Sequence, residues 1–317
     1  MSRIRTAIAV VAAALLPLGL TACASDGGDK KESSAASKEI TVTHAQGETK
    51  VKTNPEKVVV LDFGVLDTLD ALGVDSVVGL PKQALPKFLS EYGGDKYTDI
   101  GTMQEPDMEK IAELDPDLIL IGGRTAEKYA ELNALAPTLD LTVSSADFMP
   151  AFTEVSKNLG EIFGKSDVVT SELAKIDDQI AETKKSSADA GKGLIVLVSG
   201  GKLSAFGPGS RFGFVHDVLG VPAASTDLKV DRHGQAISFE FIAQTNPQQL
   251  FVIDRDAAIG QPAGEGAKEV LSNDLVGQTD AAKNKKITYL DGARWYVVGA
   301  GLNNVSAMID EISTSVK

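Results

Sequence analysis

Two segments of sixteen residues, 131 positions apart, share one pattern, and this repeat constrains the fold more than any other feature of the chain. The segments are EKIAELDPDLILIGGR (109–124) and EFIAQTNPQQLFVIDR (240–255). They align without a gap and are identical at five positions, which hold Glu, Ile, Ala, Pro and Arg. Each has the pattern of a short helix, a turn and a buried strand that ends in an arginine. The repeat therefore predicts two copies of one α/β unit.

The rest of the chain agrees with a two-lobed α/β protein. Short apolar runs alternate with helical spacing, as where 58–62 precedes 65–72, and this alternation is typical of mainly parallel sheets covered by helices. Residues 166–188 form an amphipathic stretch without Gly or Pro, which predicts one helix about 35 Å long. We expect two Rossmann-like lobes, parallel sheets flanked by helices, joined by this long helix. The expected divisions are 39–164 for the N-terminal lobe, 165–190 for the connecting helix and 191–317 for the C-terminal lobe.

Residues 1–22 have the pattern of a lipoprotein signal peptide. Two arginines precede an apolar run of about fifteen residues, which is too short to span a bilayer comfortably. Leu-Thr-Ala-Cys then resembles a bacterial lipobox, so Cys23 is the expected lipidation site; the alternative is a plain signal peptide with an incidental cysteine. Residues 23–38 are small and polar, which is typical of a flexible tether. We therefore expect an extracytoplasmic protein, held to the outer face of the cytoplasmic membrane by its lipid anchor alone.

Composition excludes several classes of function. The formal net charge of −13 disfavours non-specific binding to nucleic acid or to an anionic membrane. Cys23 is the single cysteine, so a disulfide within the chain, a zinc–thiolate site and a cysteine nucleophile are all disfavoured. Neither G-x-S-x-G nor H-E-x-x-H occurs, and no other motif favours an enzyme.

The arginines indicate where an anion would bind. The chain has 24 lysines but only seven arginines, so lysine supplies most of the solvated positive charge. Arginine is better suited to planar, bidentate recognition of oxyanions. Arg124 and Arg255 end the two equivalent strands, and ligands of open parallel sheets bind beyond the carboxyl ends of the strands. Two facing lobes would direct both side chains into one cleft, unless each is an ordinary surface or ion-pair residue.

Several motifs also carry a family resemblance. They are VVVLDFGVLDTLDALG (58–73), EPDMEKIAELDPDLILIGGR (105–124), SAFGPGSRFGFVHDVLG (204–220), DRHGQAISFEF (231–241), QLFVIDR (249–255) and RWYVVGAG (294–301). Over residues 39–317 the chain resembles the substrate-binding lipoproteins of bacterial iron-siderophore ABC importers, whose two lobes are joined by a long helix. Within that group it is most similar to receptors for catecholate siderophores of the petrobactin type.

The resemblance implies a ligand site in the cleft between the lobes. In such receptors an arginine trio binds the ferric catecholate, and the matching residues are Arg124, Arg211 and Arg255. Some members also use a histidine and a tyrosine to fill open iron positions, which match His233 and Tyr296, although the spacing from Arg255 to Tyr296 differs slightly from the family pattern. A ferric ion surrounded by catecholate oxygens is a multiply charged anion, which suits three convergent guanidinium groups.

Further residues take roles from the same resemblance. Lys82 is a candidate additional cation at the cleft. Glu109 and Glu240, at equivalent positions of the repeat, match glutamates that dock onto basic residues of the ABC permease. The alternative for these glutamates is favourable interaction with the N-terminal dipoles of two helices.

The implied protein is a monomeric binding protein, not an enzyme, without an intrinsic cofactor, because its ligand brings the ferric ion. Other ligands of the same fold remain alternatives: a hydroxamate siderophore, haem, cobalamin or a bare metal ion. Cobalamin is disfavoured because three arginines favour an anion. A bare metal ion is disfavoured because the chain has only three histidines and no cysteine besides Cys23.

Overall fold

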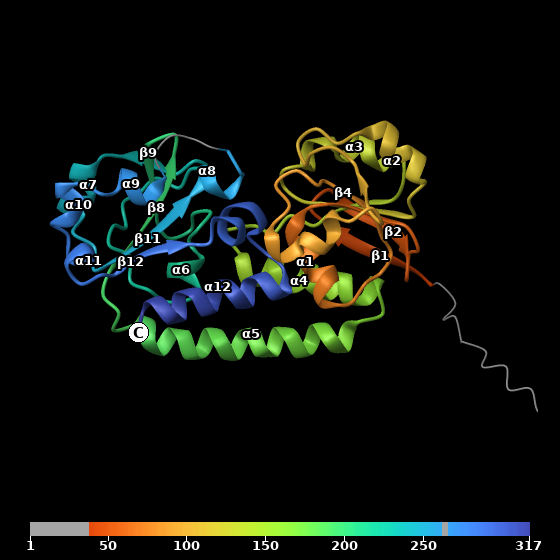
Figure 1. Cartoon of the computed structure of the whole chain (residues 1–317). Helices are drawn as coiled ribbons and strands as arrows, with labels where there is room; N and C mark the ends of the chain where they lie inside the picture. The colour runs from red at the N-terminus through yellow and green to blue at the C-terminus, as the bar shows by residue number, and fades with distance from the viewer. Residues whose placement is uncertain (1–37, 262–265) are drawn as a thin grey trace, which may run out of the picture. The chain divides into compact units, whose positions relative to one another are not determined.

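The computed structural model describes residues 38–261 and 266–317, which belong to one compact unit. The expected signal peptide, Cys23 and the tether up to residue 37 lie outside the described residues. Within the described ranges, no helix combines the length and the apolar character needed to cross a membrane. Two five-stranded sheets, each with its own helices, lie above a long helix (Figure 1).

The first sheet is parallel throughout and has the strand order β5-β4-β3-β6-β7. Its strands are β3 (Val58–Leu61), β4 (Val77–Leu80), β5 (Thr98–Asp99), β6 (Leu118–Ile121) and β7 (Thr138–Asp140). Its helices are α1 (Phe63–Ala71), η1 (Lys87–Gly93), α2 (Met108–Leu114), η2 (Ala126–Lys128), α3 (Tyr129–Asn133) and α4 (Phe148–Ile162). A separate antiparallel hairpin precedes this sheet, formed by β1 (Glu39–His44) and β2 (Gly47–Lys52). Strands β3 and β6 are wholly buried, as their apolar runs predict.

The second sheet has the order β10-β9-β8-β11-β12 and is mixed. Strands β8, β11 and β12 are parallel, whereas β9 runs antiparallel to β8 and to β10. The strands are β8 (Gly193–Ser199), β9 (Lys202–Phe206), β10 (Gln235–Ile237), β11 (Gln249–Asp254) and β12 (Ile287–Leu290). Gly200 and Gly201, both with positive φ, form the two-residue turn from β8 to β9. A turn this short can join only neighbouring antiparallel strands.

The helices of the second half are mostly short. They are α6 (Phe214–Asp217), α7 (Phe239–Thr245), α8 (Arg255–Ala258), α9 (Ala267–Val270), α10 (Asp274–Gly277), α11 (Asp280–Lys283), the π-helix η3 (Ala293–Val298) and α12 (Leu302–Ser315). The predicted α/β class, with two mainly parallel sheets flanked by helices, is confirmed.

The repeat reappears in the backbone. Strands β6 and β11 occupy the same fourth place in their sheets, and helices α2 and α7 begin and end 131 residues apart. Asp107 and Ser238 cap the two N-termini with their side chains. Both helices then stop at a residue in the left-handed conformation, Asp115 at φ 49° and Asn246 at φ 44°. The two units therefore position their last strands, and the arginines at the ends of those strands, in the same way.

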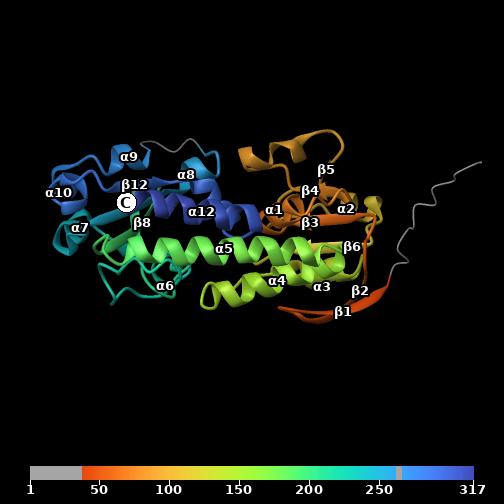
Figure 2. The same cartoon turned by 90° about the horizontal axis from the view of Figure 1, so that it is seen from below.

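The predicted connecting helix is α5 (Ser166–Ser187), with 22 residues. Its apolar stripe is buried, and the helix runs beneath both sheets in Figure 1. It is joined by α12, which packs along it, while the N-terminal end of α12 meets α1 of the first half (Figure 2). The layer that links the two lobes is therefore wider than one helix.

Candidate ligand-binding site

Three arginines from different parts of the chain converge on Tyr296. Arg124 follows β6, Arg255 follows β11 at the start of α8, and Arg211 lies in the glycine-rich loop between β9 and α6. Their Cζ atoms lie 5.9 Å, 5.6 Å and 4.2 Å from the centre of the Tyr296 ring, in the order Arg124, Arg255, Arg211. These distances are in the range of cation–π contacts, so the aromatic ring offsets part of the repulsion among the three guanidinium groups.

The hydrogen bonds of this cluster hold the guanidinium groups without neutralising two of them. Arg124 donates to the carbonyl oxygens of Val297 and Tyr296 at 2.7 Å and 2.6 Å. Arg211 donates to the same Tyr296 carbonyl at 2.6 Å. Arg255 donates from Nε to the Tyr296 hydroxyl at 3.0 Å and pairs with Asp256 at 3.2 Å. Among the described residues, neither Arg124 nor Arg211 has a carboxylate within 4.0 Å, so two net positive charges remain.

The clustering also shifts proton affinities. Burial lowers the pKa of Arg211, and the nearby charge of Arg124 lowers it further. Burial alone would raise the pKa of the Tyr296 phenol, but the hydrogen bond from Arg255 and the charges of Arg211 and Arg255 outweigh burial. The net result is a pKa below the ordinary value for tyrosine, so the site favours negative charge at the phenol oxygen and, by the same field, on any ligand placed there.

The cluster borders two hollows, both lined from the two halves of the protein. A cavity of about 340 Å³, the main cavity, is lined by Arg124, Arg211, Arg232 and Tyr296. A second hollow of about 320 Å³ shares Arg124 and Tyr296 and adds Arg255. The main cavity is within the size range of small-molecule sites.

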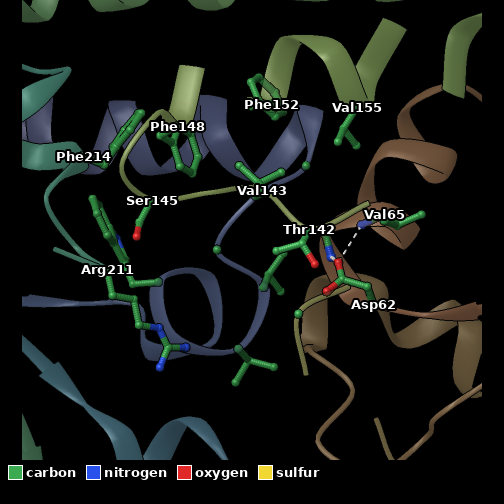
Figure 3. A pocket seen from close by; sticks show the side chains of 18 of the residues that line it. Asp62, Val65, Thr142, Val143, Ser145, Phe148, Phe152, Val155, Arg211 and Phe214 are labelled. Carbon is green, nitrogen blue, oxygen red and sulfur yellow. Dashed lines mark hydrogen bonds between the residues drawn. The ribbon is translucent and has the colours of Figure 1, made fainter. Parts of the chain in front are cut away.

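One end of the main cavity is apolar. Phe148, Phe152 and Phe214 line it (Figure 3). Trp295 is a further aromatic residue of the lining. Phe148 and Phe214 touch, with ring centres 4.9 Å apart, and the Trp295 indole N–H donates to Glu311 at 2.7 Å. Aromatic walls beside guanidinium groups suit a ligand that is both aromatic and anionic.

One carboxylate, that of Asp62, also lines the main cavity. It follows β3 and caps α1, because its Oδ1 accepts hydrogen bonds from the N–H groups of Gly64 and Val65 at 2.8 Å and 3.0 Å (Figure 3). Burial raises the pKa of Asp62, against the lowering effect of these N–H groups and of Arg124.

Two of the predicted site residues do not join the cluster. His233 is exposed, its backbone N–H donates to Asp231 at 2.8 Å, and it is not among the described residues that line either hollow. Its neighbour Arg232 lines the main cavity instead. The Lys82 ammonium donates to the carbonyls of Gly93 and Gly94 at 3.1 Å and 2.9 Å, and Lys82 is not among the described residues that line either hollow. The ligand-binding roles of His233 and Lys82 therefore stay predictions.

Glu109 and Glu240 are not among the described residues that line these hollows. Each is exposed in the first turn of its helix, α2 or α7, one on each lobe. The Ser238 hydroxyl lowers the pKa of Glu240. These surface positions are compatible with either docking or helix stabilisation.

Arg232, Asp62 and the three phenylalanines were not predicted as site residues. Asp62 had a usable signal, since it ends the apolar run 58–61 just as Arg124 ends 118–121. Arg232 stands beside the predicted His233, and only the loop conformation distinguishes the two. The phenylalanines carry no signal, because apolar residues at helical spacing also predict an ordinary core.

Two α/β lobes joined by a long helix, with a charged cavity between them, define a solute-binding protein of the helix-linked class. The chain belongs to the periplasmic binding protein family, whose model matches residues 58–293. This family consists of binding proteins, and the chain is not an enzyme.

Individual relatives agree along nearly the whole length. The chain is 47% identical over 302 residues to the petrobactin-binding protein YclQ of Bacillus subtilis, covering 94% of this chain and 95% of YclQ. The crystal structure of YclQ superimposes with a TM-score of 0.86, covering 88% and 99% of the two chains. The ferric-anguibactin-binding protein FatB of Vibrio anguillarum is 36% identical, covering 98% and 97%. The periplasmic catecholate-siderophore binding protein VctP of Vibrio cholerae is 32% identical, with a TM-score of 0.81 and coverage of 87% and 100%.

Proposed function

We propose that the protein captures a ferric catecholate siderophore of the petrobactin type between its lobes and delivers it to an ABC permease. The observation that carries this proposal is the group of three arginines around Tyr296, two of them without a neutralising carboxylate among the described residues. The near-full-length similarity to YclQ, a petrobactin-binding protein, and to the catecholate binder VctP supports the same class of ligand.

In the proposed site, charge contributes more to ligand recognition than shape does. Arg124, Arg211 and Arg255 would bind the catecholate oxygens, and each can exchange a neutral carbonyl or hydroxyl partner for an anionic one. Two unit charges 4 Å apart attract by about 4 kcal/mol at an effective dielectric of about 20, so removal of one arginine should be costly. The aromatic end of the main cavity would receive catechol rings.

Tyr296 and His233 are the candidate protein ligands of the iron. The lowered pKa of Tyr296 favours a phenolate, which is a hard oxygen ligand suited to Fe³⁺. His233 would have to move inward, because it is exposed. We propose that Tyr296 is available to the iron and that His233 reaches it only after the 231–234 turn closes over the ligand.

Delivery requires a surface on each lobe. Glu109 and Glu240 occupy equivalent exposed positions, so a permease with two basic patches at matching spacing could engage both at once. We propose this docking role for them. Cys23 and the polar tether would hold the protein on the outer face of the cytoplasmic membrane, where the permease lies.

A titration followed by tryptophan fluorescence tests the proposed function. Trp295 is the sole tryptophan and lines the main cavity, so a bound ferric catecholate should quench it. Ferric complexes of a bis-catecholate, a tris-catecholate and a trihydroxamate are compared on the wild-type protein. Saturable quenching by the catecholates at sub-micromolar concentration, with the hydroxamate much weaker, is expected. Tight binding of the hydroxamate instead, or of none of them, would refute the proposal.

A further inference from the structure

The main cavity carries charged side chains of both signs. Arg211 and Arg232 reach it from the second half of the chain, whereas Arg124 and Asp62 reach it from the first. Figure 3 shows Arg211 and Asp62 on either side of the view, with Val143, Thr142 and Ser145 along the wall between them. Among the described residues that line the cavity, Asp62 is the one acidic side chain.

We propose that Asp62 selects ligands that carry a protonated amine in the chain linking their iron-binding groups. This inference rests on the proposed function and deepens it. Asp62 lines the same cavity as Arg124 and Arg211, so a cationic group in the linking chain of a bound catecholate could pair with its carboxylate.

The capping role of Asp62 does not explain its charge. Only Oδ1 accepts the hydrogen bonds from Gly64 and Val65, while Oδ2 accepts none from any residue that the structure describes. Serine, threonine or asparagine would cap α1 equally well. A carboxylate at the wall of an anion-binding cavity opposes the binding of a purely anionic ligand, whereas a positive group in the ligand would favour the charged form of Asp62 against the burial that raises its pKa.

The charge of Arg124 acts on Asp62, yet the two side chains form no ion pair within 4.0 Å among the described residues. Arg124 lowers the pKa of Asp62, but its hydrogen bonds go to the carbonyls of Tyr296 and Val297. The alternative is that Asp62 acts through Arg124, by holding its orientation. Such a positioning role would affect every catecholate to the same extent, whereas the proposed role depends on the charge of the linker.

The test uses Asp62→Asn and two synthetic ferric bis-catecholates with linkers of equal length. One linker contains a secondary amine, and the other has an ether oxygen at the same place. Asparagine keeps the shape and the Oδ1 cap but removes the charge. Asp75→Asn, at an exposed position of the same lobe, controls for the change in net charge.

Affinity is measured by Trp295 quenching, and melting temperature verifies the fold of each variant. Asp62→Asn should weaken the amine complex on the order of tenfold and leave the ether complex unchanged or tighter. Equal changes for both complexes, or no change for either, would overturn the inference while the proposed function stands. Failure of the wild-type protein to bind either complex would overturn the proposed function and this inference with it.

Discussion

Asp67 is a buried carboxylate at the contact between the two halves, and its removal should stabilise the protein in a pH-dependent way. It lies in α1 with an exposed fraction of 1%. Its Oδ2 accepts the N–H of Asn304 at 2.9 Å, at the start of α12, while Oδ1 has no hydrogen-bond partner among the described residues. Burial raises the pKa of Asp67 from 3.8 to about 7; Asp70 adds to the rise, and the N–H groups of Asn304 and Asn303 and the charge of Arg294 oppose it.

The sign of the effect is set by proton binding. Because the pKa is higher in the folded state, the folded protein holds a proton on Asp67 between about pH 4 and pH 7 while the unfolded chain has lost it. The contribution of Asp67 to the free energy of unfolding therefore falls as the pH rises through this window, and the full penalty is present above pH 7. The difference between a pKa of 3.8 and one of about 7 corresponds to about 4 kcal/mol in the free energy of unfolding. Relaxation of the structure around Asp67 reduces the effect that is measured.

Asp67→Asn removes the ionisation and retains an oxygen acceptor for Asn304. We expect a gain in the free energy of unfolding of about 2–4 kcal/mol at pH 8 and little change at pH 4. Urea unfolding followed by circular dichroism at several pH values measures both. The exposed Asp75→Asn variant should change stability by less than about 0.5 kcal/mol at any pH. A variant that is no more stable than wild type at pH 8, or whose gain is the same at both pH values, would refute the reasoning.

Three further predictions concern the site and its surface. Arg232→Ala should weaken binding of a ferric bis-catecholate several-fold because Arg232 lines the main cavity, and His233→Ala should also weaken it because the proposed closure of the 231–234 turn brings His233 to the iron. Trp295 quenching measures both, and unchanged affinity of His233→Ala would contradict the closure. The charges of the arginines stabilise the Tyr296 phenolate, so it should form below the ordinary tyrosine pKa of about 10. The difference in absorbance between wild type and Tyr296→Phe, followed against pH, measures this ionisation. A difference that appears only above a pH of about 10 would contradict the lowered pKa. Glu109→Ala and Glu240→Ala should leave ligand affinity unchanged and lower iron uptake in cells, each alone and further together; unchanged uptake in the double variant would exclude the docking role.

The sequence was sufficient for the architecture because its signals there are local. The apolar run at 118–121 and the uninterrupted stripe of 166–187 each specify one element through periodicity and burial. The sixteen-residue repeat at a spacing of 131 positions predicted that two strands end alike, and the C-caps at Asp115 and Asn246 carry that similarity into the backbone. The antiparallel strand β9 was not expected, because a turn of two glycines was not recognised as a hairpin signal.

The site was less predictable because its contacts join distant parts of the chain. The meeting of Arg124 with the carbonyls of Tyr296 and Val297 spans up to 173 residues and depends on how the lobes pack. The resemblance to the family matched Lys82 and His233 by position alone, which does not determine where a side chain points. The carbonyls of Gly93 and Gly94 hold the Lys82 ammonium, and the turn that begins at Asp231 holds the backbone of His233. Asp62 has a positional signal, yet a lone aspartate after a strand more often predicts a helix cap alone.

The central claim is that uncompensated guanidinium groups around Tyr296 bind a ferric catecholate. The most direct test measures Trp295 quenching by one ferric bis-catecholate for wild type, Arg211→Ala and Arg211→Lys, with Arg294→Ala as the control. The Arg294 guanidinium lies over the Phe88 ring, with Cζ 4.2 Å from the ring centre, and Arg294 is not among the described residues that line the main cavity. Arg294→Ala changes the net charge by the same amount as Arg211→Ala. We predict a loss of at least about 30-fold for Arg211→Ala, a partial loss for Arg211→Lys and wild-type affinity for Arg294→Ala. Equal affinity in all four proteins would contradict the account.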